Sequence, residues 1–180
     1  MVFDRSTFVY VPIFYILMTH KTEDLYWQVI QQVICATDWK FEPGYTMNDF
    51  EKALINALEH HFLDTTKKCC LFHWKQAIRR YLITQCKFDK KEIKYALSLG
   101  VLDLLTVIPQ DEVVIKGIPF VRSLIEDGVS DVELSKWEKF WKYFDKQWIP
   151  LLDKWNICDE DGDIINVINR TNNGVESYNR

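Results

Sequence analysis

The chain has 180 residues, a formal net charge of −4 and a hydrophobic content of 48%. This composition excludes a disordered chain, because it supplies the apolar surface of one sizeable packed domain. No apolar run reaches the roughly 20 residues of a membrane-spanning helix, and the N-terminus lacks the basic segment of a secretory signal. Five scattered cysteines fit reduced thiols better than a disulfide framework. We therefore expect a soluble intracellular protein.

The first part of the chain predicts strands and helices in alternation. Ser6–Met18 is rich in β-branched and aromatic residues and predicts an edge strand, a bulge or a strand start, because Pro12 cannot donate to a sheet. Thr22–Ala36 predicts a helix with Thr22 as its N-cap. A strand that ends at Asn48 then leads into an amphipathic helix between Phe50 and Phe62. This alternation indicates an α/β layer.

The following segments change in character. Lys67–Phe72 predicts a short buried strand, and the apolar spacing from Trp74 to Leu82 predicts a second helix. Beyond Cys86 no convincing strand interrupts the sequence, and we predict that residues 85–150 are all helical. The predicted helices cover Lys87–Leu105, Ile118–Ile125 and Ser130–Trp148. The aromatic stripe of the last helix is typical of a packed core, and we favour this interpretation over a base-stacking surface.

Two acidic residues stand where a protein can use them for chemistry. Asp49 follows a predicted strand directly, and Glu176 follows a helix-start pattern near the end of the chain. Carboxylates that converge from separate elements can hold two divalent ions for phosphoryl transfer. The spacing of these two residues alone is weak support, and a pair of solvated surface charges explains it more readily.

Basic residues are concentrated between Lys67 and Lys94, where nine Lys and Arg stand against Asp89 and Glu92. Such a surface can meet phosphates, although a solvated helix face explains it equally well. We name Lys75, Arg79 and Arg80 as candidate contacts to DNA phosphates, because the helical spacing turns them outward.

Four blocks of sequence, in this order, resemble the catalytic domain of Mutator-like element (MULE) transposases. The blocks are Val11–Met18 followed by Lys21-Thr22-Glu23 and Tyr26; Asp49–Ala53; Cys70–Ala77; and Arg170–Asn173 with Glu176, Asn179 and Arg180. Together they extend the resemblance over nearly the whole chain.

The resemblance implies an α/β fold with a ribonuclease H-like core, a mixed sheet with flanking helices that an all-helical insertion interrupts. It implies an Asp, Asp, Glu triad that binds two Mg²⁺ (or Mn²⁺) ions, with Asp49 as the second Asp and Glu176 as the Glu. It also matches Cys70 and His73 to a cysteine-x-x-histidine motif. We accordingly expect a partial core over residues 1–85, the insertion over 86–165 and a return segment with the Glu-bearing helix over 166–180.

The sequence departs from the family at the first Asp of the triad. Asp4-Arg5-Ser6-Thr7-Phe8 imitates the expected motif, but Asp4 lies too close to Pro12 for the intervening hairpin. We expect Asp4 to be a turn residue, and the chain to be an N-terminally truncated domain with an incomplete active site. The two-metal site is then expected only in the full-length domain.

Cys70 and His73 also suggest a zinc half-site. A second pair of ligands at suitable spacing is missing, so we do not expect zinc. We predict instead that the thiol and the imidazole contact each other and support the strand-helix junction beside Asp49.

The leading hypothesis is a fragment of a transposase catalytic domain, which cleaves and transfers DNA strands with metal ions but is inactive in this truncated form. Its expected partners are the transposon ends, its expected location is the nucleus (or the cytoplasm before import), and self-association is left open. A non-catalytic, transposase-derived DNA- or protein-binding module is the alternative. A gene remnant that does not fold stably is a third hypothesis, which the absence of cooperative unfolding would support.

Overall fold

The computed structural model describes residues 2–4, 6–7 and 9–158. Their chain divides into two compact units, of which the first extends to Cys70 and the second begins at Leu71. We describe each unit by itself. None of the helices in the described ranges is long and apolar enough to cross a membrane.

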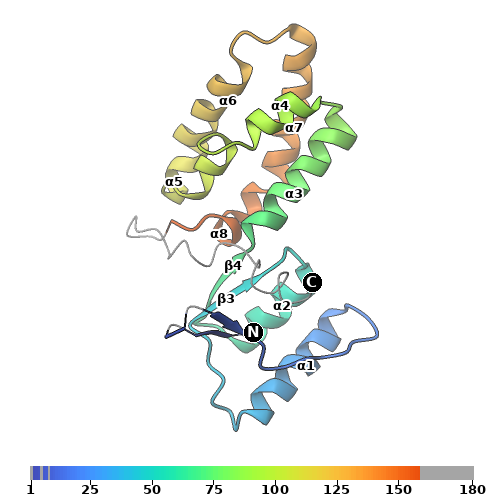
Figure 1. Cartoon of the computed structure of the whole chain (residues 1–180), viewed down its shortest axis with the longest axis vertical. Coiled ribbons are helices and arrows are strands. Elements are labelled where there is room, and N and C mark those ends of the chain that lie inside the picture. The colour runs from blue at the N-terminus through green and yellow to red at the C-terminus, as the bar shows by residue number, and fades with distance from the viewer. Residues whose placement is uncertain (1, 5, 8, 159–180) are drawn as a thin grey trace. The chain divides into compact units, whose positions relative to one another are not determined.

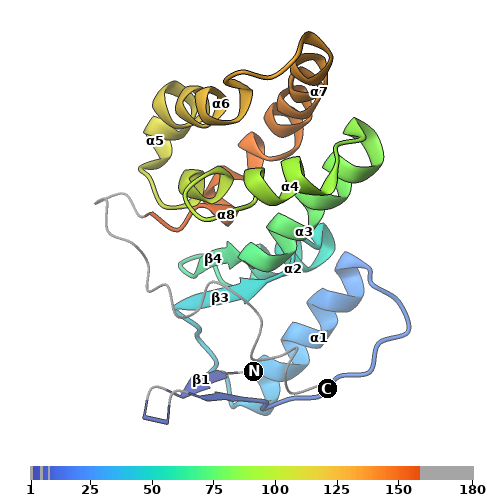
Figure 2. The ribbon, with the colours of Figure 1, turned by 45° about the horizontal axis from the view of Figure 1, so that its top comes forward.

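Within its described residues, the first unit contains two helices and four short strands (Figure 1). In chain order its elements are β1 (Val2–Asp4), β2 (Val9–Val11), α1 (Glu23–Ala36), β3 (Tyr45–Asn48), α2 (Lys52–His61) and β4 (Thr66–Cys69). Strands β1 and β2 form an antiparallel hairpin, whereas β3 and β4 pair in parallel, as Figure 2 shows. The prediction of a mixed α/β class is confirmed. The described strands nevertheless form two separate pairs rather than one mixed sheet.

The first helix agrees with its prediction. The Thr22 side chain accepts a hydrogen bond from the Leu25 amide over 3.3 Å, which caps α1. Tyr26, Ile30 and Ile34 form the buried face of α1 and pack against Ala57 and Phe62. The core of this unit therefore lies between α1 and α2.

Two predicted strands are shorter in the structure. β2 ends at Val11, directly before Pro12, because proline has no amide hydrogen for the next rung of a ladder. β4 ends at Cys69, and Leu71 already belongs to α3 (Leu71–Tyr81). The helix begins this early because its buried positions Trp74 and Ile78 follow helical spacing.

Among the described residues 71–158 of the second unit, the regular elements are all helices, joined by turns and loops. After α3 come η1 (Leu82–Cys86), α4 (Lys90–Ala96), η2 (Leu102–Thr106), α5 (Gln110–Glu112), η3 (Val113–Gly117), α6 (Ile118–Glu126), α7 (Asp131–Gln147), η4 (Ile149–Leu151) and α8 (Leu152–Trp155). The predicted helix over Lys87–Leu105 is broken in two. α4 ends at Ala96, and Gly100 adopts a φ of +84° in the turn before η2, a conformation that favours glycine and does not occur inside a right-handed helix.

Aromatic side chains form the core of the second unit. Trp74 of α3 stacks on Trp155, with ring centroids 5.4 Å apart, and meets Phe144 of α7 edge-on at 6.3 Å. The predicted aromatic stripe of α7 is fully buried, which confirms its role in packing. We expected α3 in the first domain, residues 1–85. It packs into the second unit because its apolar face carries Trp74 into this aromatic core.

Candidate functional site

Asp49 lies at the carboxyl end of the parallel strand pair. It follows β3 directly, beside the pairing of Asn48 with Cys69. The Cys70 amide donates to the Asn48 carbonyl over 2.8 Å and extends the ladder by one bond. Ligands of α/β proteins bind outside this end of parallel strands. The strand, acid and helix order predicted around Asp49 is present, with the carboxylate half-buried.

The turn after β3 is held by a cysteine that the sequence did not single out. The Cys69 thiol donates to Asn48 Oδ1 over 3.2 Å and lies 3.7 Å from the Asp49 carbonyl oxygen. Asn48 is buried, with 7% of its surface exposed, so this pairing compensates for an otherwise costly buried amide. The Cys69 thiol thus supports the turn that carries Asp49.

Glu51, two residues after Asp49, is the centre of a small polar network. Glu51 Oε2 accepts from the Tyr26 hydroxyl over 2.9 Å and from Lys21 Nζ over 3.2 Å. Burial, the hydrogen bond to Glu51 and the negative charges of Glu51 and Asp49 together raise the pKa of Tyr26 to about 12. The Tyr26 hydroxyl thus lies near two carboxylates, of which Glu51 is also paired with Lys21.

The residues that the structure describes do not fit a complete metal site. Among them no group of three or more His, Cys, Asp or Glu side chains could hold a metal ion. Glu176, the predicted partner of Asp49, lies outside the described residues. Asp4 is the last residue of β1, where it pairs with Val9. The two predicted metal ligands are therefore not both among the described residues, and their joint role remains a prediction.

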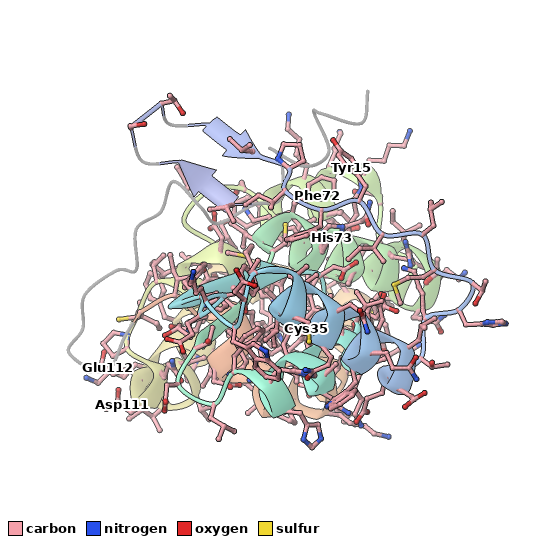
Figure 3. All side chains as sticks on the ribbon, turned by 90° about the horizontal axis from the view of Figure 1, so that it is seen from below. Tyr15, Cys35, Phe72, His73, Asp111 and Glu112 are labelled. Carbon is pink, nitrogen blue, oxygen red and sulfur yellow. The ribbon has the colours of Figure 1, made fainter. Side chains whose placement is uncertain are left out.

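Cys70 and His73 lie on either side of the junction between β4 and α3. Cys70 is fully buried, whereas His73 is partly buried. The His73 ring packs edge-on against Phe72, with centroids 5.6 Å apart, and Figure 3 labels both side chains. Their predicted thiol-imidazole contact remains a prediction.

The three basic residues predicted to bind nucleic acid differ in their surroundings. Lys75 Nζ lies 3.0 Å from Asp103 Oδ2, and the Asp103 side chain is only 7% exposed. Arg79 and Arg80 project from the exposed side of α3. Lys75 therefore serves an internal ion pair, and the two arginines are the cations that α3 presents to solvent.

Sequence reasoning did not assign roles to Lys21, Tyr26 or Glu51. All three lie inside the sequence blocks that carry the family resemblance. This position was the one signal in the sequence that could have marked them as candidate site residues. Helical periodicity marked Tyr26 as an apolar position on α1, and it could not reveal a hydroxyl bond to Glu51, the residue before α2.

The described site has the arrangement of an α/β protein that uses a carboxylate at the end of a parallel strand. Residues 2–77 match the family model of the MULE transposase domain. This match confirms the resemblance to a MULE transposase domain over a stretch that contains Asp49, Cys70 and His73. No match is found among curated proteins or among solved structures.

Proposed function

We propose that this chain carries part of the ribonuclease H-like catalytic domain of a MULE-type DNA transposase. The supporting observation is the place of Asp49, at the carboxyl end of a parallel strand pair, inside the stretch that matches the family model. We assign Asp49 and Glu176 to the binding of Mg²⁺ or Mn²⁺ in the complete domain.

The 180-residue chain, in this proposal, binds DNA without cutting it. This part of the proposal rests on the resemblance, in which no residue of this sequence matches the first Asp of the metal-binding triad. Arg79 and Arg80 offer exposed guanidinium groups to phosphate oxygens, which they can bind in a bidentate manner. Lys75 supports this surface through its ion pair with Asp103.

A plasmid-nicking assay tests the missing cleavage. We expect the purified chain to leave supercoiled plasmid intact in Mg²⁺ or Mn²⁺, with Asp49→Ala giving the same result. Nicking by the unchanged chain that Asp49→Ala abolishes would show a working active site and contradict this part of the proposal. In parallel, DNA binding should weaken with salt, persist in Asp49→Ala and decline in the double variant Arg79→Ala/Arg80→Ala.

The second candidate function is a non-catalytic DNA- or protein-binding module. The Tyr26, Lys21 and Glu51 network favours it, because these contacts give the Asp49 turn a structural role that needs no metal. Addition of Mn²⁺ to isotope-labelled protein separates the two candidates. A carboxylate that evolved to ligate metal retains weak affinity for a single ion and predicts paramagnetic broadening of amide signals near Asp49 that Asp49→Asn removes, whereas the module predicts no such effect.

We further propose transposon-end DNA as the partner and, because that partner is DNA, the nucleus as the place of action. Self-association of the chain is part of the same proposal. Light scattering at several protein concentrations measures it, and a constant monomer mass would contradict it.

A further inference from the structure

We propose that a groove along α3 and η1 binds a single-stranded segment of DNA, with a base stacked on Phe72 and phosphates held by Arg79 and Arg80. This inference rests on the proposed role in DNA binding and specifies the form of the DNA. The groove belongs entirely to the second unit and has a volume of about 550 Å³.

The groove follows one face of a continuous helical segment. Its principal lining residues are Phe72, Gln76, Arg79, Arg80, Ile83 and Leu97. Residues that are three or four positions apart lie on the same face of a helix. Such intervals separate Phe72 from Gln76, Gln76 from Arg79, and Arg79 from Ile83. The opposite face carries Trp74 and Ile78 into the aromatic core.

Apolar side chains remain exposed along this face. Phe72 is 42% exposed and Ile83 is 46% exposed, although a helix facing water normally presents polar residues there. The His73 ring packs edge-on against Phe72, with an interplanar angle of 82°. Figure 3 shows the two rings beside each other at the beginning of α3. The orientation of the Phe72 ring is thus constrained before any ligand binds.

The cations beside this apolar strip are available for phosphates. Neither Arg79 nor Arg80 forms an ion pair with another residue in the described ranges, and both are exposed. Lys75, which also lines the groove, is neutralised by Asp103. The groove therefore combines two solvent-facing positive charges with an aromatic ring and has no exposed acidic lining residue.

This combination fits an unpaired strand better than a duplex. In duplex DNA the faces of the bases are stacked on each other, and only phosphates and base edges reach a protein surface. Phe72 and Ile83 would then make few contacts with the bases of a bound duplex. An unpaired base offers its π-face to an aromatic side chain while the adjacent phosphates meet cations, which is how proteins hold single strands without sequence preference.

Fluorescence anisotropy with a labelled 20-nucleotide single strand, and with the blunt duplex of the same sequence, tests the proposal on the full chain. We expect tighter binding of the single strand and about tenfold weaker binding after Phe72→Ala, with the duplex little affected. Phe120→Ala is the matched control, because Phe120 is 51% exposed on α6, away from the groove lining. The double variant Arg79→Ala/Arg80→Ala should weaken both forms.

Equal effects of Phe72→Ala on both DNA forms, or no effect on either, would overturn the groove proposal and leave DNA binding intact. Failure of the unchanged chain to bind any DNA would overturn the proposed function as well.

A crosslinking experiment on the unchanged protein tests the proposal even if the Phe72→Ala variant does not fold. A single strand containing 5-iodouracil, irradiated in complex with the unchanged protein, should crosslink to the peptide that contains Phe72. Crosslinks confined to other peptides would contradict the proposal.

Discussion

The Tyr26 hydroxyl donates a hydrogen bond to Glu51 Oε2 over 2.9 Å, and this bond joins α1 to the residue that precedes α2. The Cys69 thiol contacts the same turn from the side of β4. The backbone around Asp49 is consequently fixed by side chains from two other elements. The position of the candidate carboxylate thus depends on the packing of the whole first unit.

Replacing Tyr26 with Phe should lower the free energy of unfolding by about 1.5–3 kcal/mol, because a hydrogen bond to a charged group is lost. Glu51→Gln keeps an acceptor for the hydroxyl and should cost less. Urea unfolding followed by circular dichroism measures both variants. Equal losses for the two would show that the charge of Glu51, rather than the hydroxyl bond, stabilises the turn.

The raised pKa of Tyr26 predicts a loss of stability in alkali. A tyrosine whose pKa is near 10 in the unfolded chain and about 12 in the folded protein stabilises the fold fully below pH 10. This contribution disappears as the pH rises from 10 to 12. Between pH 9 and pH 11.5 the unchanged chain should therefore lose more unfolding free energy than Tyr26→Phe. Parallel declines of the two proteins would contradict the assignment.

The Lys75 and Asp103 pair makes a further prediction. Asp103→Asn should destabilise the protein by about 2–3 kcal/mol, less than a fully buried pair, because Lys75 is 28% exposed. Lys116→Met, which breaks the exposed pair with Glu112, is the control and should have no measurable effect on the thermal midpoint. A similar small shift for both variants would show that the Lys75 pair is only a surface contact.

The start of α7 has a reciprocal cap. The Ser130 hydroxyl accepts from the Glu133 amide, and the Glu133 side chain accepts from the Ser130 amide over 2.9 Å. Ser130→Ala should cost about 1 kcal/mol of unfolding free energy. Ser135→Ala is the matched control, because this serine lies inside the same helix. Equal midpoints of Ser130→Ala and Ser135→Ala in chemical denaturation would argue against the cap.

Local sequence signals were sufficient where one segment determines its own structure. Thr22 and Ser130 precede helices whose first turns carry acidic residues, and both helices begin where predicted. The spacing of apolar residues likewise identified the aromatic core of α7. In these cases the capping bond and the buried stripe belong to one helix, so a short window contains the whole signal.

Contacts between distant segments were not predictable in this way. The bond from Tyr26 to Glu51 and the ion pair of Lys75 with Asp103 each join residues more than 20 positions apart. Gly100 was taken as an interior helix position, since periodicity does not report a positive φ. For the candidate site, the sequence located Asp49 at the end of a strand but could not identify Cys69 as its neighbour.

The Lys75 and Asp103 ion pair also limits how many counterions a DNA strand releases when it binds in this groove. Each phosphate that a protein neutralises on single-stranded DNA changes the slope of log affinity against log salt by about 0.7. Because Lys75 already faces a carboxylate, the double variant Lys75→Met/Asp103→Asn, which removes both charges, should leave this slope unchanged, whereas Arg79→Ala should reduce its magnitude by about 0.7. An internal ion pair thereby fixes the charge stoichiometry of the proposed complex at two phosphates.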